Sequence, residues 1–477
     1  MSPTEKSVRR SETRGGSQPH RHGSIVHEVR DVLALPDCPV FVPNRHSRGV
    51  IWDPTQQDIV AEALTGVHGL PERQDAEINQ AWLRKALEVE PDSSTTLEEP
   101  CIFGGVLIRH FGHFCHEGLS RLWWLGSADL MPAPLQSAAK TLQALQSNVW
   151  FFMPPWLDQG KDLLAYMEEI LAGLGLEPGR VRIISEPIRF RHLLIPFQPW
   201  GFDVRPSQVE ENYGCDSLQL MRHLLAGYLP SPLRGMNPPE KYSTTSAQPT
   251  SPAQSQLRVF VSRSALPLDQ GRLIGDVILD QVLAEAGFLV FHPENHSITD
   301  QITLYSAANE LVFIDGSSLY LLWFSHLKPG ATIKVILRRR QGLWMAERIH
   351  DLLPDGASLR WEVIDALMAE GLTSEQDWLS HNLGDLRTVL IRILGQAPPS
   401  LSHDAREALM AYAKELVTET QPTQQAAVLE ALLEAMVTAP HRLQASRRTF
   451  LKLRLKSLGR RFKRWARSIA LVPQASR

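Results

Sequence analysis

The sequence contains few cysteines, and none of them form a motif. Only four occur in the 477 residues, and no two are separated by just two positions: Cys38, Cys101, Cys115 and Cys215. Small disulfide-stapled domains carry closely spaced cysteines in even numbers. A disulfide framework is therefore not expected here, and a reducing compartment fits the composition.

Long hydrophobic runs are also missing. No stretch reaches the roughly 18 consecutive apolar residues that a membrane-spanning helix needs, and the first residues are polar, without the apolar segment of a signal peptide. The content of 43% hydrophobic and 21% charged residues is that of ordinary globular proteins. We therefore expect a cytoplasmic protein.

The small net charge of −3 hides an uneven distribution. Residues Arg442–Arg477 hold twelve Lys or Arg and no Asp or Glu, which leaves 37 basic and 52 acidic residues in the rest of the chain. Within this tail, apolar side chains recur at helical spacing: Leu451, Leu455, Leu458, Phe462, Trp465 and Ile469. The pattern predicts a basic amphipathic helix over 451–469, suited to an anionic membrane surface. Docking on an acidic partner, or on the chain's own acidic body, is the main alternative; we expect no nucleic-acid partner.

Composition divides the chain into segments. Residues 1–27 form a basic leader without periodicity, which predicts disorder. Residues 230–256 are dense in Pro, Ser, Thr and Gln and predict a linker. We expect one α/β domain over 28–229, a second over 257–340, and a helical region over 341–440 before the tail at 441–477. In the helical region, Ser358–Ile364 is among the segments predicted to be helical.

Short apolar runs alternate with helical patterns between Leu257 and Leu337. The predicted strands are Leu257–Arg263, Leu289–Phe291, Glu310–Ile314 and Thr332–Leu337, and the predicted helices between them are Ile274–Ala286, Asp300–Ala308 and Leu319–Phe324. Such alternation is typical of a parallel sheet. The amino-terminal half has a similar series, beginning at the strand Ile102–Ile108, so the predicted fold class is α/β in both halves.

Two polar loops follow strands of the second domain. Ser262, Arg263 and Arg272 lie after the first strand, and Asp315, Gly316, Ser317 and Ser318 lie after the third. Ligands of parallel sheets bind beyond the carboxyl ends of the strands. Arginine forks suit phosphate oxygens, and backbone amides at a helix start attract anions. The loops predict a diphosphate site, although ordinary loops with solvated arginines would give the same pattern.

A histidine-rich stretch follows the strand Ile102–Ile108. Phe114, Leu119 and Trp123 predict an amphipathic helix that starts after Gly112, and helical spacing places His113, His116 and Glu117 near one another. His113 or Glu117 could act as a general base, because an imidazole titrates near neutral pH. Alternatively, His113 is structural and bonds a backbone group. A metal site including His110 is a third and less favoured interpretation, since the spacing differs from that of HExxH.

Both stretches together resemble glycosyltransferase family 61, whose bacterial members are described as capsular-polysaccharide biosynthesis proteins. The matching features of the second domain are Val261-Ser-Arg263, Arg272, Gln301-Ile302, Asp315-Gly-Ser-Ser318, Leu322-Trp-Phe324 and Pro329-Gly330. In the first domain, Phe111-Gly-His-Phe114 is similar to the family's Tyr-Gly-His motif, and Glu117 and Arg121 match by position. Asp315 stands where the family usually has histidine.

The resemblance implies a glycosyltransferase with two Rossmann-like domains of the GT-B type and a C-terminal helical extension. The first domain would hold a glycan or lipid-linked acceptor, with His113 and Glu117 as catalytic residues. The second would bind a nucleotide-diphosphate sugar through Ser262, Arg263, Arg272, Gln301 and the 315–318 turn. Transfer would proceed with inversion, in surface polysaccharide synthesis.

No metal or cofactor is expected besides the donor sugar nucleotide. Metal-dependent sugar transferases of the other common fold hold a divalent ion on an Asp-x-Asp pair, and no two aspartates here are separated by one residue. Two rival functions remain. One is a degenerate member of the family that binds a glycan or nucleotide without turnover, and the other is a scaffold recruited to the inner face of the membrane through its tail.

Overall fold

The structure is a computed structural model. It describes residues 24–42, 45–63, 77–78, 87, 95–153, 162–201, 206–213, 215–228, 256–267, 270–353, 359–370 and 380–396. The chain divides into two compact units, residues 1–229 and residues 230–477. The predicted linker, nearly all of the leader and the basic tail lie outside the described residues.

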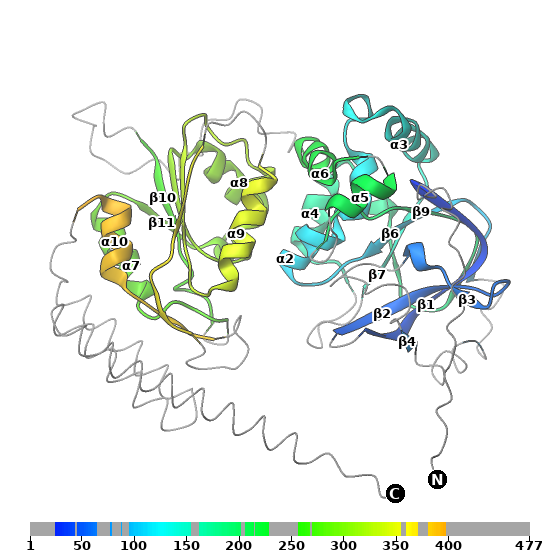
Figure 1. Cartoon of the computed structure of the whole chain (residues 1–477), viewed down its shortest axis with the longest axis horizontal. Helices are drawn as coiled ribbons and strands as arrows, with labels where there is room; N and C mark the ends of the chain where they lie inside the picture. The colour runs from blue at the N-terminus through cyan, green and yellow to red at the C-terminus, as the bar shows by residue number, and fades with distance from the viewer. Residues whose placement is uncertain are drawn as a thin grey trace, which may run out of the picture. The chain divides into compact units, whose positions relative to one another are not determined.

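A mixed sheet forms the centre of the first unit (Figure 1). Its strands follow the order β3-β2-β1-β9-β6-β7-β8, with β4 paired to β1 and β5 to β9. Their bounds are β1 Val26–Val42, β2 Arg45–Asp53, β3 Asp58–Ile59, β4 Glu77–Ile78, β5 Thr96–Leu97, β6 Cys101–Val106, β7 Val149–Phe152, β8 Val181–Ile184 and β9 Ile188–Pro196. Strand β1 begins at Val26, just inside the range predicted as a disordered leader.

Strands β6, β7, β8 and β9 run parallel, whereas β1 pairs antiparallel with both β9 and β2. In this part of the sheet β7 and β8 are added on one side of β6, whereas the next strand in the chain, β9, lies on its other side. Such a reversal is where open α/β sheets bind their ligands. One connection is unusual, because only residues 185–187 join β8 to β9 and no helix intervenes.

Helices cover this sheet around an apolar core. They are α2 Phe111–His113, α3 Ala133–Leu145, α4 Ala165–Gly173, α5 Pro206–Tyr213 and α6 Ser217–Ala226. Asp216 caps α6, since its carboxylate accepts the N–H groups of Leu218 and Gln219. The buried cluster on the sheet includes Val32, Ile51, Phe103, Phe190 and Ile195.

The helix predicted after Gly112 differs from a regular amphipathic helix. A π-helical turn, Phe114–Gly118, follows α2, and a 3₁₀ helix, Ser120–Leu125, follows the turn. The N–H of Leu119 donates to the carbonyl of Phe114, five residues earlier. Every residue from Phe114 to Trp124 is buried. The segment therefore has no solvent-facing stripe, and the prediction of an amphipathic helix was wrong.

Five parallel strands form the sheet of the second unit, in the order β11-β10-β12-β13-β14. They are β10 Arg258–Val261, β11 Leu289–Phe291, β12 Glu310–Ile314, β13 Thr332–Ile336 and β14 Arg360–Ile364. In this register Val259 lies beside Leu311, and Phe313 beside Val335. The central strands β10 and β12 are buried on both faces, which explains their nearly continuous apolar sequences.

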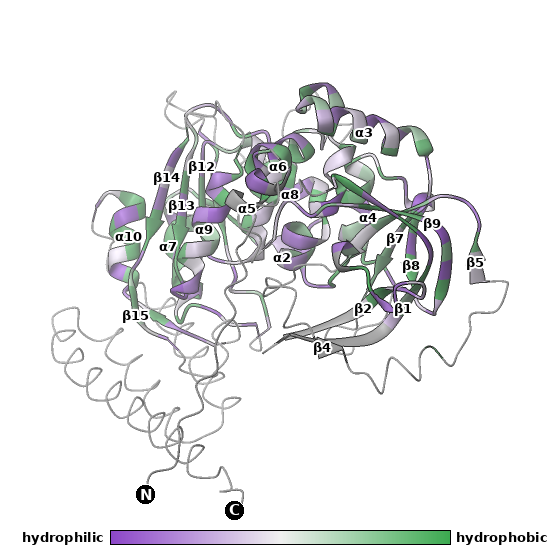
Figure 2. Cartoon of the chain, turned by 45° about the vertical axis from the view of Figure 1, so that its right-hand side comes forward, coloured by the Kyte–Doolittle hydropathy of each residue, from purple (hydrophilic) through white to green (hydrophobic). Residues whose placement is uncertain are grey.

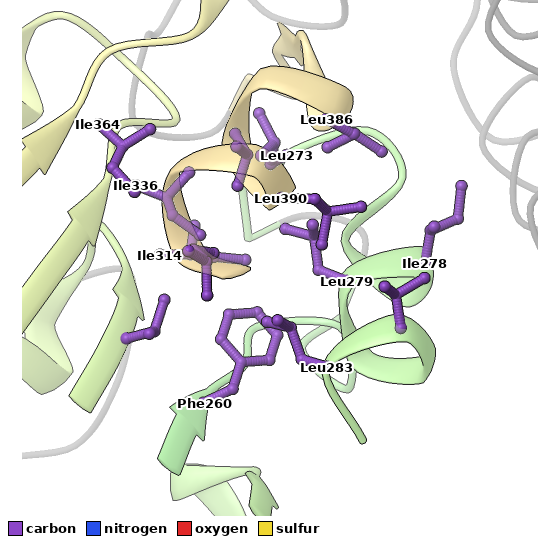
Figure 3. Close-up of a cluster of buried hydrophobic side chains, with 14 of the residues drawn as sticks. Phe260, Leu273, Ile278, Leu279, Leu283, Ile314, Ile336, Ile364, Leu386 and Leu390 are labelled. Atoms are coloured by element: carbon purple, nitrogen blue, oxygen red, sulfur yellow. The ribbon is translucent and has the colours of Figure 1, made fainter. Parts of the chain in front are cut away.

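Helices lie on both faces of this sheet (Figure 1). They are α7 Asp276–Glu285, α8 Ile298–Ala307, α9 Gln341–Asp351 and α10 Leu386–Leu394. Helices α7 and α10 pack on one face around Phe260, Ile314 and Ile336 (Figure 3). Hydrophilic and hydrophobic residues both occur along α10 (Figure 2), and its buried residues are Leu386, Val389, Leu390 and Ile393. These are spaced as one face of an amphipathic helix.

The second α/β domain was predicted to end at residue 340, but its sheet continues beyond that residue. Ser358–Ile364 was predicted to be helical, yet Arg360–Ile364 forms the edge strand β14 beside β13. Its alternation of Arg, Trp, Glu and Val has the period of two that marks a strand. Two further short strands follow, β15 Leu367–Ala369 and β16 Leu383–Gly384. Within 341–396, the predicted helical extension is therefore part of the second α/β unit.

The amino-terminal edge of the second sheet carries a ladder of charges. The carboxylate of Glu310 binds Arg258 Nε at 2.7 Å and Lys334 Nζ at 3.0 Å. Lys334 also donates to the last carbonyls of α10, those of Arg392 and Ile393. These contacts join three adjacent strands to a covering helix at the edge opposite the polar loops, so that edge is built for stability.

We expect Phe260→Ala to lower the free energy of unfolding by about 3–5 kcal/mol, because it removes a fully buried ring from the centre of the α7–α10 core. Ile391→Ala on α10 is the matched control, since this side chain is 37% exposed. Urea denaturation of the full chain measures both changes. A loss below 1 kcal/mol for Phe260→Ala would contradict the described core.

Candidate functional site

The polar loops of the second unit meet where the strand order reverses. Numbered along the chain, the five strands lie in the order 2-1-3-4-5, so the direction changes between β10 and β12. Ser262 and Arg263 follow β10, and Asp315 and Gly316 follow β12. Ligands of doubly wound sheets bind at this point. The structure thus brings the two sequence-predicted loops to one edge.

Arg263 lies directly against Gly316. A Cβ atom added to Gly316 would overlap Nη1 of Arg263, so only glycine leaves room for the guanidinium here. Nη2 of Arg263 donates to the carbonyl of Gly271 at 3.2 Å. Burial lowers the pKa of Arg263 and the charge of Asp315 raises it. The side chain remains a cation, held at the start of the 3₁₀ helix Ser317–Phe324.

A hydroxyl–carboxylate network shapes the loop after β10. The buried Ser262 accepts the backbone N–H of Ser264 at 3.0 Å, and the hydroxyl of Ser264 donates to Asp280 on α7. Burial raises the pKa of Asp280, and these serines oppose the shift. Ser262 therefore fixes the backbone on both sides of Arg263.

Asp315 is completely buried, and its carboxylate is bonded within the protein. Oδ1 accepts the backbone N–H of Arg338 at 2.8 Å, and Oδ2 lies 3.4 Å from Nε of Arg339. A Cβ atom at Gly342, in the first turn of α9, would overlap this carboxylate. Asp315 thus faces the loop between β13 and α9.

Two further residues predicted to bind the donor sugar nucleotide form bonds within the protein instead. Arg272 forms a two-point ion pair with Asp276, with Nε–Oδ2 at 2.9 Å and Nη2–Oδ1 at 2.6 Å. Gln301 on α8 donates to the carbonyls of Pro293 and His296, which closes the loop after β11. The predicted Ser317 and Ser318 are half-buried, in the first turn of the 3₁₀ helix.

Four further residues, which the sequence did not predict as site residues, gather at the same edge. Arg338 and Arg339 follow β13, while His381 and Asn382 come from a buried segment that pairs with Leu273. Asn382 Nδ2 donates to the carbonyl of Arg338 at 2.7 Å. An available signal for the arginines was their position immediately after a predicted strand; none existed for the 380–382 segment.

The pKa of His381 reflects the positive charges at this edge. Its pKa is lowered to about 4, first by burial and then by the charges of Arg272, Arg338 and Arg263. Three guanidinium groups are therefore near enough to disfavour a positive charge on this imidazole. The site is a place of positive potential, which suits anions.

In the first unit, the predicted base lies just past β6, beside the reversal between β6 and β9. His113 Nδ1 is 2.9 Å from Glu117 Oε2, across the π-helical turn. The Glu117 side chain is fully buried and the His113 side chain is 16% exposed. When Glu117 is ionised its carboxylate can only accept, so in that state Nδ1 carries the proton and Nε2 holds the lone pair. Single π-helical turns occur frequently at functional sites.

Burial lowers the pKa of His113 to about 4. The imidazole is therefore neutral at pH 7 and able to accept a proton. Its geometry is that of a histidine oriented by a carboxylate, an arrangement that hydrolases and transferases use to activate hydroxyl groups. The structure thus brings together the two residues predicted to be catalytic, His113 and Glu117, and their catalytic role stays a prediction.

The neighbouring polar residues have packing roles. The ring of His116 lies 5.5 Å from that of Trp200, whose backbone N–H donates to the Ser120 hydroxyl. Arg121 donates to the carbonyl of Pro196 at the end of β9. Over the residues that the structure describes, no three His, Cys, Asp or Glu side chains are arranged to hold a metal ion.

Residues 111–333 match the family described as Glycosyltransferase 61. This region of the chain belongs to glycosyltransferase family 61. The match begins at α2 and ends within β13, so it includes the His113–Glu117 pair together with Arg263 and Gly316. Arg338, Arg339 and His381 lie beyond the matched region. A comparison with curated proteins finds no match.

The described helices were also compared with the length and polarity that a membrane span requires. In the ranges that the structure describes, every helix is too short or too polar to cross a bilayer.

We expect the stability of the protein to fall as the pH drops from 7 to 5. His113 and His381 have a pKa of about 4 when folded and an ordinary value near 6.5 when unfolded. The unfolded chain therefore binds more protons in this window, and stability present above pH 6.5 is lost towards pH 4. For His381 the loss at pH 5 is roughly 2 kcal/mol.

Urea denaturation at pH 7 and pH 5 checks this dependence. His381→Gln should remove its share of the loss, whereas His326→Gln, at an exposed position, should keep the wild-type dependence. An unchanged difference between the two pH values in His381→Gln would show that His381 is protonated as easily in the fold as in the unfolded chain.

Proposed function

We propose that the chain transfers a sugar from a nucleotide-diphosphate donor to a hydroxyl group of a glycan or lipid-linked acceptor. The observation that carries this proposal is the guanidinium of Arg263, seated on Gly316 where the order of the second sheet reverses. Ligands of doubly wound sheets bind at this reversal, and the planar guanidinium can donate two hydrogen bonds to a phosphate group. Membership of family 61 supports glycosyl transfer as the reaction.

We also propose that the two units are the Rossmann-like domains of a GT-B transferase. The second unit supports this with five parallel strands in doubly wound order and helices on both faces. The first unit supports it with the order β8-β7-β6-β9, although its β8–β9 connection lacks a helix. In this proposal the second unit binds the donor and the first binds the acceptor.

Donor binding would rest on protein cations. The departing diphosphate gains negative charge as the glycosidic bond breaks, and fixed positive groups stabilise that charge most when they are already in place. Arg263 and the backbone amides at Ser317 and Ser318 would supply this stabilisation. Since the sequence has no Asp-x-Asp pair, we propose a mechanism without a metal ion.

The His113–Glu117 pair would activate the acceptor. Glu117 accepts the Nδ1 proton of His113, which leaves Nε2 to take the proton of the acceptor hydroxyl. The acceptor oxygen then bonds to the anomeric carbon, and the bond from that carbon to the diphosphate oxygen breaks. A single displacement of this kind inverts the anomeric configuration.

Calorimetry of the full chain with a panel of nucleoside diphosphates tests the donor site. We expect one nucleotide to bind and Arg263→Ala to weaken its binding roughly 10–100-fold, the worth of a charge-assisted hydrogen bond. Arg387→Ala, at an exposed position of α10, should bind like the wild type. If no nucleotide binds, the proposed function fails.

The same preparation tests the base through transfer to candidate acceptors. We expect His113→Ala to lower kcat by 10²–10⁴-fold while nucleotide binding is retained, and His326→Ala to act like the wild type. With a His113 pKa of about 4, kcat/KM should stay level from pH 7 to pH 5. Nucleotide binding with no transfer to any acceptor would favour the rival function, a non-catalytic member.

A role in surface polysaccharide synthesis at the cytoplasmic face of the membrane is the fuller form of this proposal. The basic, amphipathic pattern of 451–469 supports membrane contact, since cationic side chains are drawn to anionic lipids. Removal of 451–477 should reduce sedimentation with vesicles containing phosphatidylserine at least several-fold. Equal sedimentation of the truncated and full-length chains would remove the tail from the proposal.

A further inference from the structure

Arg272 is poorly placed to act as a phosphate ligand. Its guanidinium is 5% exposed and forms a planar, two-point pair with the fully buried carboxylate of Asp276. Its third contact, from Nη1, is to the carbonyl of Leu266. These bonds tie the loop after β10 to the first turn of α7. The charge of Arg272 is thus already balanced inside the protein.

The loop after β13 offers different arginines. Asp315 Oδ1 accepts the backbone N–H of Arg338, and the carbonyl of Asp315 accepts Nε of Arg338 at 3.0 Å. Asp315 Oδ2 lies 3.4 Å from Nε of Arg339. The Arg339 side chain is 15% exposed, and this Nε contact leaves both of its Nη groups for other partners. Through these bonds Asp315 determines where the two guanidinium groups lie.

Several cations lie close together here. The Asp315 carboxylate lies 3.6 Å from Nε of Arg338 and 3.4 Å from Nε of Arg339, and its charge also attracts Arg263. Arg263 and Arg339 are close enough to repel each other, since Arg339 contributes to the lowered pKa of Arg263 after burial. Like charges in a partly buried site cost free energy unless an anion joins them. A diphosphate, with its several charged oxygens, suits such a group of cations.

Two more distant carboxylates also attract Arg263. Asp276 is paired with Arg272. Glu294 lies in the loop after β11, 3.9 Å from Nδ1 of His292, and its side chain is 26% exposed.

We propose that Arg339 is the second cation of the diphosphate site and that the Asp315 carboxylate positions it there, while Arg272 supports the loop. This inference rests on the proposed donor site and adds a ligand from outside the matched family region. Asp315 is then a positioning residue and makes no contact with the donor. The three strand ends of β10, β12 and β13 each contribute to the site.

Calorimetric titration of the full chain with inorganic pyrophosphate, and with the nucleoside diphosphate that binds best, tests the role of Arg339. We expect Arg339→Ala to weaken both ligands roughly 10–100-fold. Arg340→Ala is the matched control, because Arg340 is the next residue and is exposed, with its own partner Glu370; it should stay within about threefold of the wild type. Arg339→Lys, which keeps the charge, should recover part of the loss and decides the matter if Arg339→Ala folds poorly.

Asp315→Asn distinguishes positioning from simple repulsion. The substitution removes a negative charge, so a carboxylate facing the phosphates would make the variant bind pyrophosphate more tightly. A positioning carboxylate predicts the opposite, a loss of about fivefold or more. In an Arg339→Ala background the same substitution should have little further effect, because residues that act through one another are not additive.

The outcomes separate this inference from the function on which it rests. If Arg272→Gln loses binding while Arg339→Ala and Arg339→Lys match the wild type, Arg272 is the ligand and the inference is overturned, with the donor site intact. Tighter binding by Asp315→Asn also overturns it. If the wild type binds neither pyrophosphate nor any nucleoside diphosphate, the proposed function itself fails.

Discussion

A single buried carboxylate holds together the polar edge of the second unit. Asp315 ends strand β12 and bonds the backbone of Arg338, so two neighbouring strand ends become one structure. A buried, unpaired carboxylate would cost several kcal/mol, and this cost is offset only while the arginine loop stays in place. The arrangement makes the loop conformation and the ion pairing mutually dependent. The position of the cations that face the candidate diphosphate site follows from that dependence.

Parallel strands explain why distant parts of the sequence meet here. All five strands of the second sheet end at the same edge, so the loops after β10, β12 and β13 are neighbours although they are about 75 residues apart in sequence, from Arg263 to Arg338. The opposite edge is occupied by the Glu310 ion pairs, which join adjacent strands. Stability and ligand binding are thus assigned to opposite ends of the same strands.

Much of this fold could be predicted from local pattern. The strands β10, β11, β12 and β13 are short apolar runs with clear limits, and the helices between them have regular spacing. Strand β14 was missed because its residues Arg360 and Glu362 are polar, which suits an edge strand and weakens the apolar signal. The π-helical turn at Phe114–Gly118 was missed because hydrophobic periodicity carries no information on a bond to the fifth residue.

The candidate site was predicted less completely than the fold. Residue type and position after a strand were enough to propose His113, Glu117, Arg263 and Gly316 as candidates. They could not show that Arg272 is balanced by Asp276, because an ion pair depends on rotamers that the sequence does not specify. They also could not propose His381, because its neighbour Asn382 pairs with Leu273 from more than 100 residues away.

Gly342 limits which residues can occupy position 315. It lies so close to Asp315 that any side chain there would occupy the space of the carboxylate. The two positions therefore share one small volume, and a side chain at 342 would require a smaller residue at 315. Glycine at 342 already leaves the most room possible, so a longer side chain in place of Asp315 would have to displace the start of helix α9, which carries position 342. The size of residue 315 and the position of that helix are thus linked.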